Sequence, residues 1–289
     1  MKRLLNIFVL TIILLLCTGC RSEVNTQIAA TTRPVYDFTS YLCKDTGLSV
    51  SCIVTQNISC LHDYTLQVDQ MQKLENAQLI VLSGAGLEAF MEDMLVNKKT
   101  IDASKNIPLL CSTHSHTDDH HEHHENDPHI WLSIDAAQQM SQNIYDGLIE
   151  QYPEHKDIFI RNLEQLNNEF NSLKTYGATV LKEISCKNLI TFHDGFSYFA
   201  DANGLHILKA IEEESGSEAS AKELSQIIEL INENNIPAIF VEKNGSVSAA
   251  QIISAETGVK IYYLDMAMGE TGYFDAMYNN FNALKEAME

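Results

Sequence analysis

The chain has 289 residues, a formal net charge of −20 at pH 7, and 45% hydrophobic residues. This length suits two lobes, each with its own core, better than one. The acidity argues against binding to nucleic acids or, by charge, to anionic lipids, and it weakly raises the local concentration of cations.

The first residues have the pattern of a secretory signal peptide. Lys2 and Arg3 precede an uncharged apolar stretch at 4–16, which is shorter than the roughly 20 residues of a membrane span. Residues 17–20 resemble a bacterial lipobox, which implies removal of residues 1–19 and a diacylglyceryl anchor on Cys20. The alternative is an ordinary signal peptide cut elsewhere. We therefore expect an extracytoplasmic protein, lipid-anchored to a bacterial cell membrane.

Residues 28–102 alternate short apolar runs with helical patterns. We expect helices at 35–44 and 66–76, between strands at 28–32, 48–54, 79–82 and, more weakly, 100–102.

Five cysteines besides Cys20 remain after cleavage, and this odd number leaves at least one free thiol. The five are Cys43, Cys52, Cys60, Cys111 and Cys186. Their spacing selects no disulfide, although one bridge among the first three is possible.

Seven of the eleven histidines lie within the sixteen residues 114–129. Neutral imidazoles bind borderline-soft cations such as zinc, and the interleaved Asp and Glu residues keep the run solvated. The alternative is a solvated loop that does not bind metal. We expect the loop at 114–126 to hold metal with low affinity, rather than to form the specific site, through His114, His116, His120, His121, His123 and His124.

A long helix is expected to join two α/β halves. Residues 153–184 begin with a proline, contain one glycine (Gly177) and carry apolar residues at helical spacing. The second half repeats the strand–helix rhythm, with a helix at 221–234 and strands at 188–192, 206–209, 238–241 and 259–264. Strands separated by helices predict parallel sheets. The expected division is a lobe at 20–152, the linking helix at 153–184 and a lobe at 185–289.

Candidate metal ligands lie near predicted strand ends, where open parallel sheets bind ligands. His193 and Asp265 directly follow strands, His62 comes a few residues after one, and His129 precedes a helix. Three imidazoles and one carboxylate would complete a tetrahedral zinc shell, with two ligands from each half of the chain. His206, inside a short strand, is expected to be a core histidine rather than a ligand.

Six segments spread over almost the whole chain carry a family pattern: TTRPVYDF at 31–38, HDY at 62–64, DPHIWL at 127–132, FHDGFSYFA at 192–200, EASAKEL at 218–224 and YLDM at 263–266. Together they resemble the ZnuA-type zinc-binding receptors of metal-uptake ABC transporters, and DPHIWL is the most specific of them. The resemblance implies two (β/α) lobes bridged by a rigid helix, with metal in the cleft between them. It also implies the ligands His62, His129, His193 and Asp265.

The sequence departs from that family near the first ligand. The usual proline-rich approach to His62 is replaced by residues 58–61, and Cys60 could compete as a soft thiolate ligand. This departure concerns the geometry around the metal and the choice of metal. Histidine at 193 favours zinc, because manganese-preferring relatives tend to have glutamate there.

We therefore expect a monomeric receptor, not an enzyme, that delivers Zn²⁺ to an ABC permease and its ATPase. Three alternatives remain at this point. The cargo could be manganese, or the protein could be a surface adhesin or zinc buffer without a transport partner. In a surface metallohydrolase, three histidines and a zinc-bound water would act, and Asp265 would not be a ligand.

Overall fold

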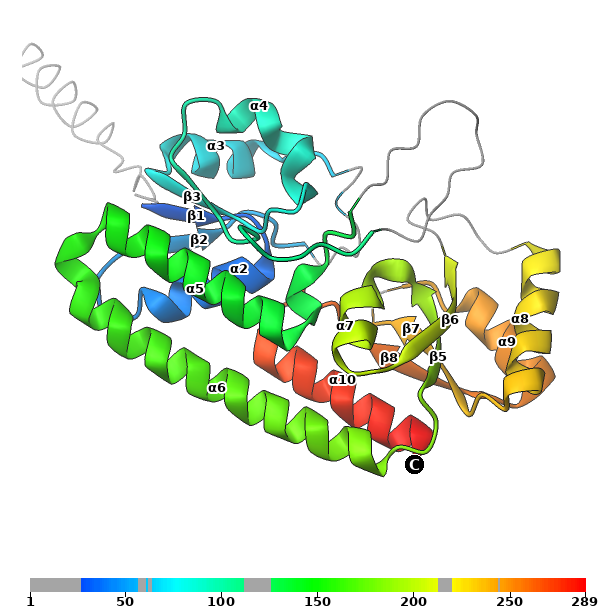
Figure 1. Ribbon diagram of the computed structural model, residues 1–289. Helices are drawn as coiled ribbons and strands as arrows, with labels where there is room; N and C mark the ends of the chain where they lie inside the picture. The colour runs from blue at the N-terminus through cyan, green and yellow to red at the C-terminus, as the bar shows by residue number, and fades with distance from the viewer. Residues whose placement is uncertain (1–26, 57–60, 62–63, 112–125, 213–219, 244) are drawn as a thin grey trace, which may run out of the picture.

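In the part of the chain that the structure describes, the strands form two separate four-stranded sheets, one in each half (Figure 1). This computed structural model describes residues 27–56, 61, 64–111, 126–212, 220–243 and 245–289. The predicted signal peptide, Cys20, Cys60, His62 and the histidine-rich run at 114–124 lie outside the described residues.

The first sheet has the order β2-β1-β3-β4, and all its strands are parallel. Its strands are β1 (Ile28–Ala30), β2 (Val50–Cys52), β3 (Leu79–Leu82) and β4 (Thr100–Asp102). The helices of this lobe are α2 (Arg33–Leu42), α3 (Val68–Asn76), η1 (Leu87–Met91), α4 (Glu92–Leu95), η2 (Ile130–Leu132) and α5 (Ile134–Gln151). The predicted strands are confirmed, and the first two are shorter than expected.

The second sheet repeats this arrangement, with the order β6-β5-β7-β8 and parallel strands throughout. Its strands are β5 (Asn188–His193), β6 (His206–Glu212), β7 (Ala238–Glu242) and β8 (Lys260–Leu264). The helices here are η4 (Asp194–Phe196), α7 (Ser197–Ala202), α8 (Ala221–Asn234), α9 (Ser248–Thr257) and α10 (Tyr273–Met288). The predicted α/β fold of two lobes with parallel sheets is therefore confirmed.

A single long helix, α6 (Lys156–Glu183), runs from one lobe to the other along the edge of the molecule (Figure 1). It follows a separate turn of 3-10 helix, η3 (Pro153–His155), so the α-helix begins three residues later than predicted. At 1.5 Å per residue its 28 residues extend about 42 Å. Helices α5 and α10 both pack against α6. The predicted connecting helix is confirmed.

The two lobes share one hydrophobic core. Phe38 of α2, Phe170 of α6 and Tyr273 of α10 are buried together, with ring centroids 4.8–5.9 Å apart. Smaller cores lie against the other faces of the two sheets. Because the shared core joins elements from both halves, separating the lobes would expose large apolar side chains to water.

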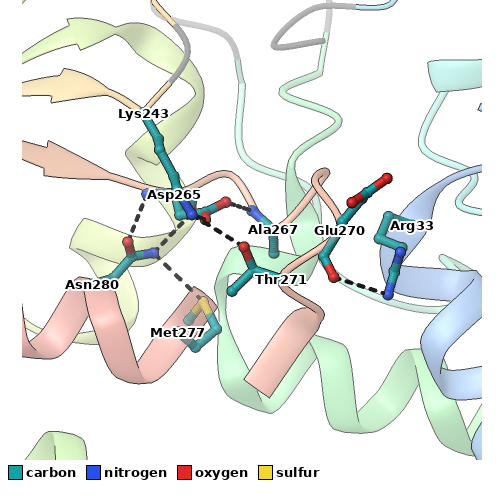
Figure 2. Close-up of polar contacts among 8 residues, drawn as sticks. All are labelled: Arg33, Lys243, Asp265, Ala267, Glu270, Thr271, Met277 and Asn280. Atoms are coloured by element: carbon teal, nitrogen blue, oxygen red, sulfur yellow. Dashed lines mark hydrogen bonds and ion pairs between the residues drawn. The ribbon is translucent and has the colours of Figure 1, made fainter. Parts of the chain in front are cut away.

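Polar contacts also cross between the lobes. Asp37 of α2 accepts a hydrogen bond from the backbone N–H of Tyr273 at 2.9 Å and pairs with Arg33 at 2.7 Å. The Arg33 guanidinium also approaches the backbone carbonyl of Glu270 at 3.4 Å (Figure 2). The segment before α10 is thereby tied to the first lobe.

Two expectations about single residues are settled by the fold. His206 is exposed, so its assignment to the core was wrong: β6 is an edge strand of its sheet. Cys43 and Cys52 are free thiols, as are Cys111 and Cys186, so no bridge joins the first two.

None of the helices among the described residues is long and apolar enough to cross a membrane.

Candidate metal centre

Three of the four predicted ligands occupy the ends of structural elements where the lobes meet. His193 is the last residue of β5, Asp265 directly follows β8, and His129 directly precedes η2. Each is buried, with 3% of the residue exposed for His129, 7% for His193 and 6% for Asp265. Buried polar side chains in loops at strand ends are typical of ligand sites in parallel sheets.

His129 is held by a neighbouring carboxylate. The Oδ1 atom of Asp127 lies 2.8 Å from Nδ1 of the His129 ring and also accepts the His129 backbone N–H at 2.9 Å. With Nδ1–H donating to Asp127, the lone pair of a neutral imidazole lies on Nε2. A carboxylate that orients a histidine in this way is common behind metal-binding imidazoles.

His193 lies against His129, although 64 positions separate them in the chain. Their ring centroids are 5.4 Å apart and the rings are nearly perpendicular, at 87°. The Nδ1 atom of His193 is 3.5 Å from a carboxylate oxygen of Asp194. The structure thus brings one predicted ligand from each half of the chain side by side.

The backbone at Gly195 makes room for His193. A Cβ atom at Gly195 would lie 2.8 Å from Nε2 of His193 and 2.7 Å from the methyl carbon of Met266. Both distances are shorter than a Cβ atom tolerates, so a side chain at this position would require His193 and Met266 to shift. Glycine at 195 therefore lets the His193 ring and the Met266 side chain approach the same point.

Asp265 is fixed at both its backbone and its side chain (Figure 2). Asn280 of α10 accepts the Asp265 N–H at 2.7 Å and donates to the Asp265 carbonyl at 2.8 Å. The carboxylate accepts the backbone N–H of Ala267 at 2.9 Å through Oδ1 and pairs with Lys243 at 3.1 Å through Oδ2. A pocket of about 420 Å³ lies beside this ion pair.

The loop that carries Asp265 reaches both histidine segments. The indole N–H of Trp131 donates to the backbone carbonyl of Met266 at 2.8 Å, and Trp131 also contacts the His129 ring, with centroids 5.5 Å apart. Met266 meets the His193 segment at Gly195, as described above. The segments of three predicted ligands therefore converge.

Convergence of these segments is not yet a metal-binding geometry. Among the described residues, no group of three or more His, Cys, Asp or Glu side chains is arranged to hold a metal ion. The fourth predicted ligand, His62, is outside the described part of the chain, as is the rival Cys60. The carboxylate of Asp265 pairs with Lys243.

Sequence reasoning missed three residues that shape this region: Asp127, Gly195 and Lys243. Asp127 could have been found from its spacing, because a carboxylate two residues before a histidine can reach the ring. Lys243 directly follows β7, in the same kind of position as Asp265 after β8. Lysine is not a metal-ligating residue type at neutral pH, so its place at a strand end carries no signal for a metal site.

Comparisons with known proteins give a consistent family. Residues 28–287 match the family described as "ZnuA: Zinc-uptake complex component A periplasmic". The zinc-binding lipoprotein AdcA of Streptococcus pneumoniae is 30% identical over 283 residues, which cover 91% of this chain and 56% of AdcA. The high-affinity zinc uptake system protein ZnuA of Bacillus subtilis is 25% identical over 284 residues, covering 91% and 87%. The chain thus spans about half the length of AdcA and most of the Bacillus protein.

Solved structures agree with the sequence relatives. A crystal structure of ZnuA has a TM-score of 0.81 and 27% identity, and covers 91% of this chain and 98% of that one. The Zn(II)-bound ZnuA-like domain of Streptococcus pneumoniae AdcA has a TM-score of 0.75 and 28% identity, over 90% and 98%. Because the family match runs through nearly all of the described residues, this chain belongs to the ZnuA family of periplasmic zinc-uptake components.

Proposed function

We propose that this protein is an extracytoplasmic receptor that binds Zn²⁺ and delivers it to an ABC-type metal importer. The observation that carries the proposal is the pair of buried imidazoles, His129 and His193, which come from opposite halves of the chain with ring centroids 5.4 Å apart. Neutral imidazole is a preferred ligand of zinc. Membership of a family of zinc-uptake components supports the same cargo.

The proposed zinc shell consists of His62, His129, His193 and Asp265. Four protein ligands close a tetrahedral zinc shell, as a receptor needs, whereas a catalytic zinc keeps one position for water. Asp127 would hold His129 in the tautomer that presents Nε2 to the metal. Three imidazoles favour zinc over manganese, which prefers oxygen ligands.

Zinc capture in this proposal draws the ligands of the two lobes together. Metal–ligand bonds then favour the closed arrangement, to the extent that zinc binds it more tightly than the open one. The shared core around Phe38, Phe170 and Tyr273 supports a small rearrangement of the lobes instead of a wide hinge motion. A permease and its ATPase would respond to that small change.

We propose that residues 1–19 are a signal peptide and that Cys20 carries the lipid that anchors a monomer to the membrane. The lobes would comprise residues 20–152 and 185–289, joined by 153–184. The lipoprotein name of AdcA supports an anchor in a relative. Histidines of the 114–124 run would supply zinc to the cleft at high effective concentration.

The proposal is tested by titrating zinc, manganese and nickel against the soluble protein that starts at Arg21. We expect tight one-to-one zinc binding that is lost in His129→Ala and retained when residues 114–124 are deleted. His206→Ala is the matched control, because His206 is exposed on an edge strand. The opposite pattern, with binding lost in the deletion and kept in His129→Ala, would make the histidine run the primary site.

A further inference from the structure

The carboxylate of the proposed ligand Asp265 already has a cationic partner. The ammonium of Lys243 lies 3.1 Å from Oδ2 of Asp265 and 3.1 Å from the hydroxyl of Thr271 (Figure 2). The other carboxylate oxygen, Oδ1, accepts the backbone N–H of Ala267. Lys243 therefore contacts Oδ2, the carboxylate oxygen to which Ala267 does not donate.

The two partners of this ion pair differ in freedom. The Asp265 backbone is held by two hydrogen bonds to Asn280, its carboxylate accepts the Ala267 N–H, and only 8% of its side chain is exposed. The side chain of Lys243 is 46% exposed and borders the pocket of about 420 Å³. The Lys243 backbone is anchored by its N–H to the carbonyl of Leu264 at 2.8 Å. The lysine side chain can therefore swing into solvent while the aspartate stays in place.

We propose that Lys243 is an internal cation that competes with zinc for Asp265 and thereby sets the zinc affinity of the receptor. This inference rests on the proposed function, because it needs Asp265 to be a zinc ligand. In the metal-free protein, Lys243 compensates the buried negative charge of Asp265. When zinc arrives, the ammonium leaves Oδ2 and the metal takes its place; when zinc departs, the ammonium returns.

Simultaneous binding is disfavoured by charge repulsion. Zinc binds carboxylate oxygens at about 2.0–2.2 Å. An ammonium that stayed 3.1 Å from the same oxygen would be at most about 5 Å from the ion. Two cations that close lie well within the screening length of roughly 8 Å at physiological salt, so their repulsion is not screened by salt. Zinc binding therefore includes the work of breaking the lysine–aspartate pair.

The geometry of the described site agrees with this competition. Two imidazoles, those of His129 and His193, are already side by side. The carboxylate that would join them is paired with Lys243. Movement of one exposed lysine side chain would release it, with no rearrangement of the fold.

The first test compares zinc affinity in three variants by competition with a chelator. Lys243→Gln should bind zinc about tenfold more tightly than wild type, because the competitor is gone. Lys243→Arg, which keeps the cation, should stay closer to wild type. Lys285→Gln is the charge-matched control. Lys285 lies in the last turn of α10 and pairs with Glu183 at 2.6 Å. Its replacement should leave zinc affinity unchanged. Unchanged or weaker zinc binding by Lys243→Gln would overturn the inference.

Asp265→Asn separates this inference from the proposed function. Zinc binding should weaken in Asp265→Asn, and adding Lys243→Gln to that variant should give no further gain, since the carboxylate contested by the lysine is absent. If Asp265→Asn binds zinc as wild type does, Asp265 is not a ligand and the proposed function loses this part of its site. If Asp265→Asn weakens binding but Lys243→Gln brings the same tenfold gain in both backgrounds, the lysine acts by its charge alone and the competition is wrong.

A second measurement detects the lysine directly. Labelling of the Lys243 amine by a reagent such as acetic anhydride, followed by mass spectrometry, should increase when zinc is bound, because the ammonium has left Asp265. Labelling of Lys285 serves as the internal reference. Lower or unchanged labelling of Lys243 with zinc would contradict the proposed exchange.

Discussion

Gly195 controls the position of the His193 ring. Any side chain here would meet Nε2 of His193 and the methyl of Met266 at less than 3 Å. The methionine end is flexible and can move, but the imidazole is confined by burial and by its contact with His129. A change at Gly195 therefore acts on the position of the proposed ligand His193 more than on the fold.

We predict that Gly195→Ala weakens zinc binding by about ten- to a hundredfold, the range seen when the support of a metal ligand is disturbed. Calorimetric zinc titration measures this effect. Ser225→Ala is the control, because Ser225 is exposed on α8, away from the proposed ligands. Wild-type zinc affinity in Gly195→Ala would show that the His193 ring position does not govern binding.

Glu88 is a buried carboxyl group at the ends of β1 and β3. Its oxygens accept hydrogen bonds from the Thr31 hydroxyl at 2.6 Å and from the backbone N–H groups of Ser83 and Gly84 at 2.7 and 3.0 Å. Burial nonetheless raises the pKa of Glu88 to about 7, because desolvation outweighs these hydrogen bonds. As the pH rises, the unfolded chain loses the Glu88 proton near its pKa of 4.5, whereas the folded protein keeps this proton up to about pH 7.

Stability linked to Glu88 should decrease as pH rises from about 4.5 to about 7. The folded state holds the proton more tightly than the unfolded state over this range, so raising the pH favours unfolding by up to about 3 kcal/mol. Urea unfolding at several pH values should show this decrease in wild type and not in Glu88→Gln. Glu92→Gln, an exposed carboxyl on α4, is the control and should follow wild type. If the free energy of unfolding has the same pH dependence in wild type and in Glu88→Gln, the raised pKa of Glu88 is contradicted.

At the scale of single residues, the sequence pointed to His129, His193 and Asp265 because each stands at an element end and within a recognisable motif. The structure brings their segments together. The partner of Asp265 could not be inferred in the same way. The contact of Lys243 depends on the path of a long side chain between the ends of two neighbouring strands, β7 and β8, and no local pattern encodes that path.

Among the elements, α6 is notable for its one glycine. Gly177 faces Phe281 of α10, and a Cβ at Gly177 would overlap that ring. Phe281 is fully buried, so it has little room to move. Glycine at this position allows α6 and α10 to approach closely.

Two effects oppose each other in Gly177→Ala. Alanine in a helix interior is more favourable than glycine by about 1 kcal/mol. Overpacking a buried contact costs about 1–3 kcal/mol. We expect the overlap with Phe281 to dominate, so that the free energy of unfolding falls by up to about 2 kcal/mol in urea denaturation. A variant more stable than wild type would show that the two helices separate without strain.

Periodicity predicted α6 well, because its buried residues recur on one face over many turns: Phe159, Leu163, Leu166, Phe170, Leu173 and Val180. Its start was placed too early, since a proline suits both a 3-10 turn and the first turn of an α-helix. The short strands β1 and β2 were predicted longer than they are, because an apolar run does not mark where backbone pairing ends.

In the whole molecule, the core around Phe38, Phe170 and Tyr273 joins the lobes into one unit. The phenol of Tyr273 donates to the backbone carbonyl of Trp131 at 2.9 Å and so adds a buried polar link to the apolar contacts. Sequence predicted two lobes and a connecting helix. It could not predict that α2, α6 and α10 form one shared core, because this depends on packing between residues more than one hundred positions apart.

A shared core predicts that the lobes unfold together. Fluorescence of Trp131, the only tryptophan, reports on the contact between lobes, while far-ultraviolet circular dichroism reports on all helices. Thermal transitions followed by the two signals should coincide. Zinc at a hundred times its Kd should also add about 2.7 kcal/mol to the stability of the folded state. Two separate midpoints would indicate that the lobes unfold independently.

The most direct test of the zinc site is anomalous diffraction at the zinc edge from crystals of the zinc-loaded protein. We expect one fully occupied ion between the lobes, with His62, His129, His193 and Asp265 at about 2.0–2.2 Å and Lys243 turned away from Asp265. An ion bound by the 114–124 histidines alone, or held by the sulfur of Cys60 in place of Asp265, would contradict this account.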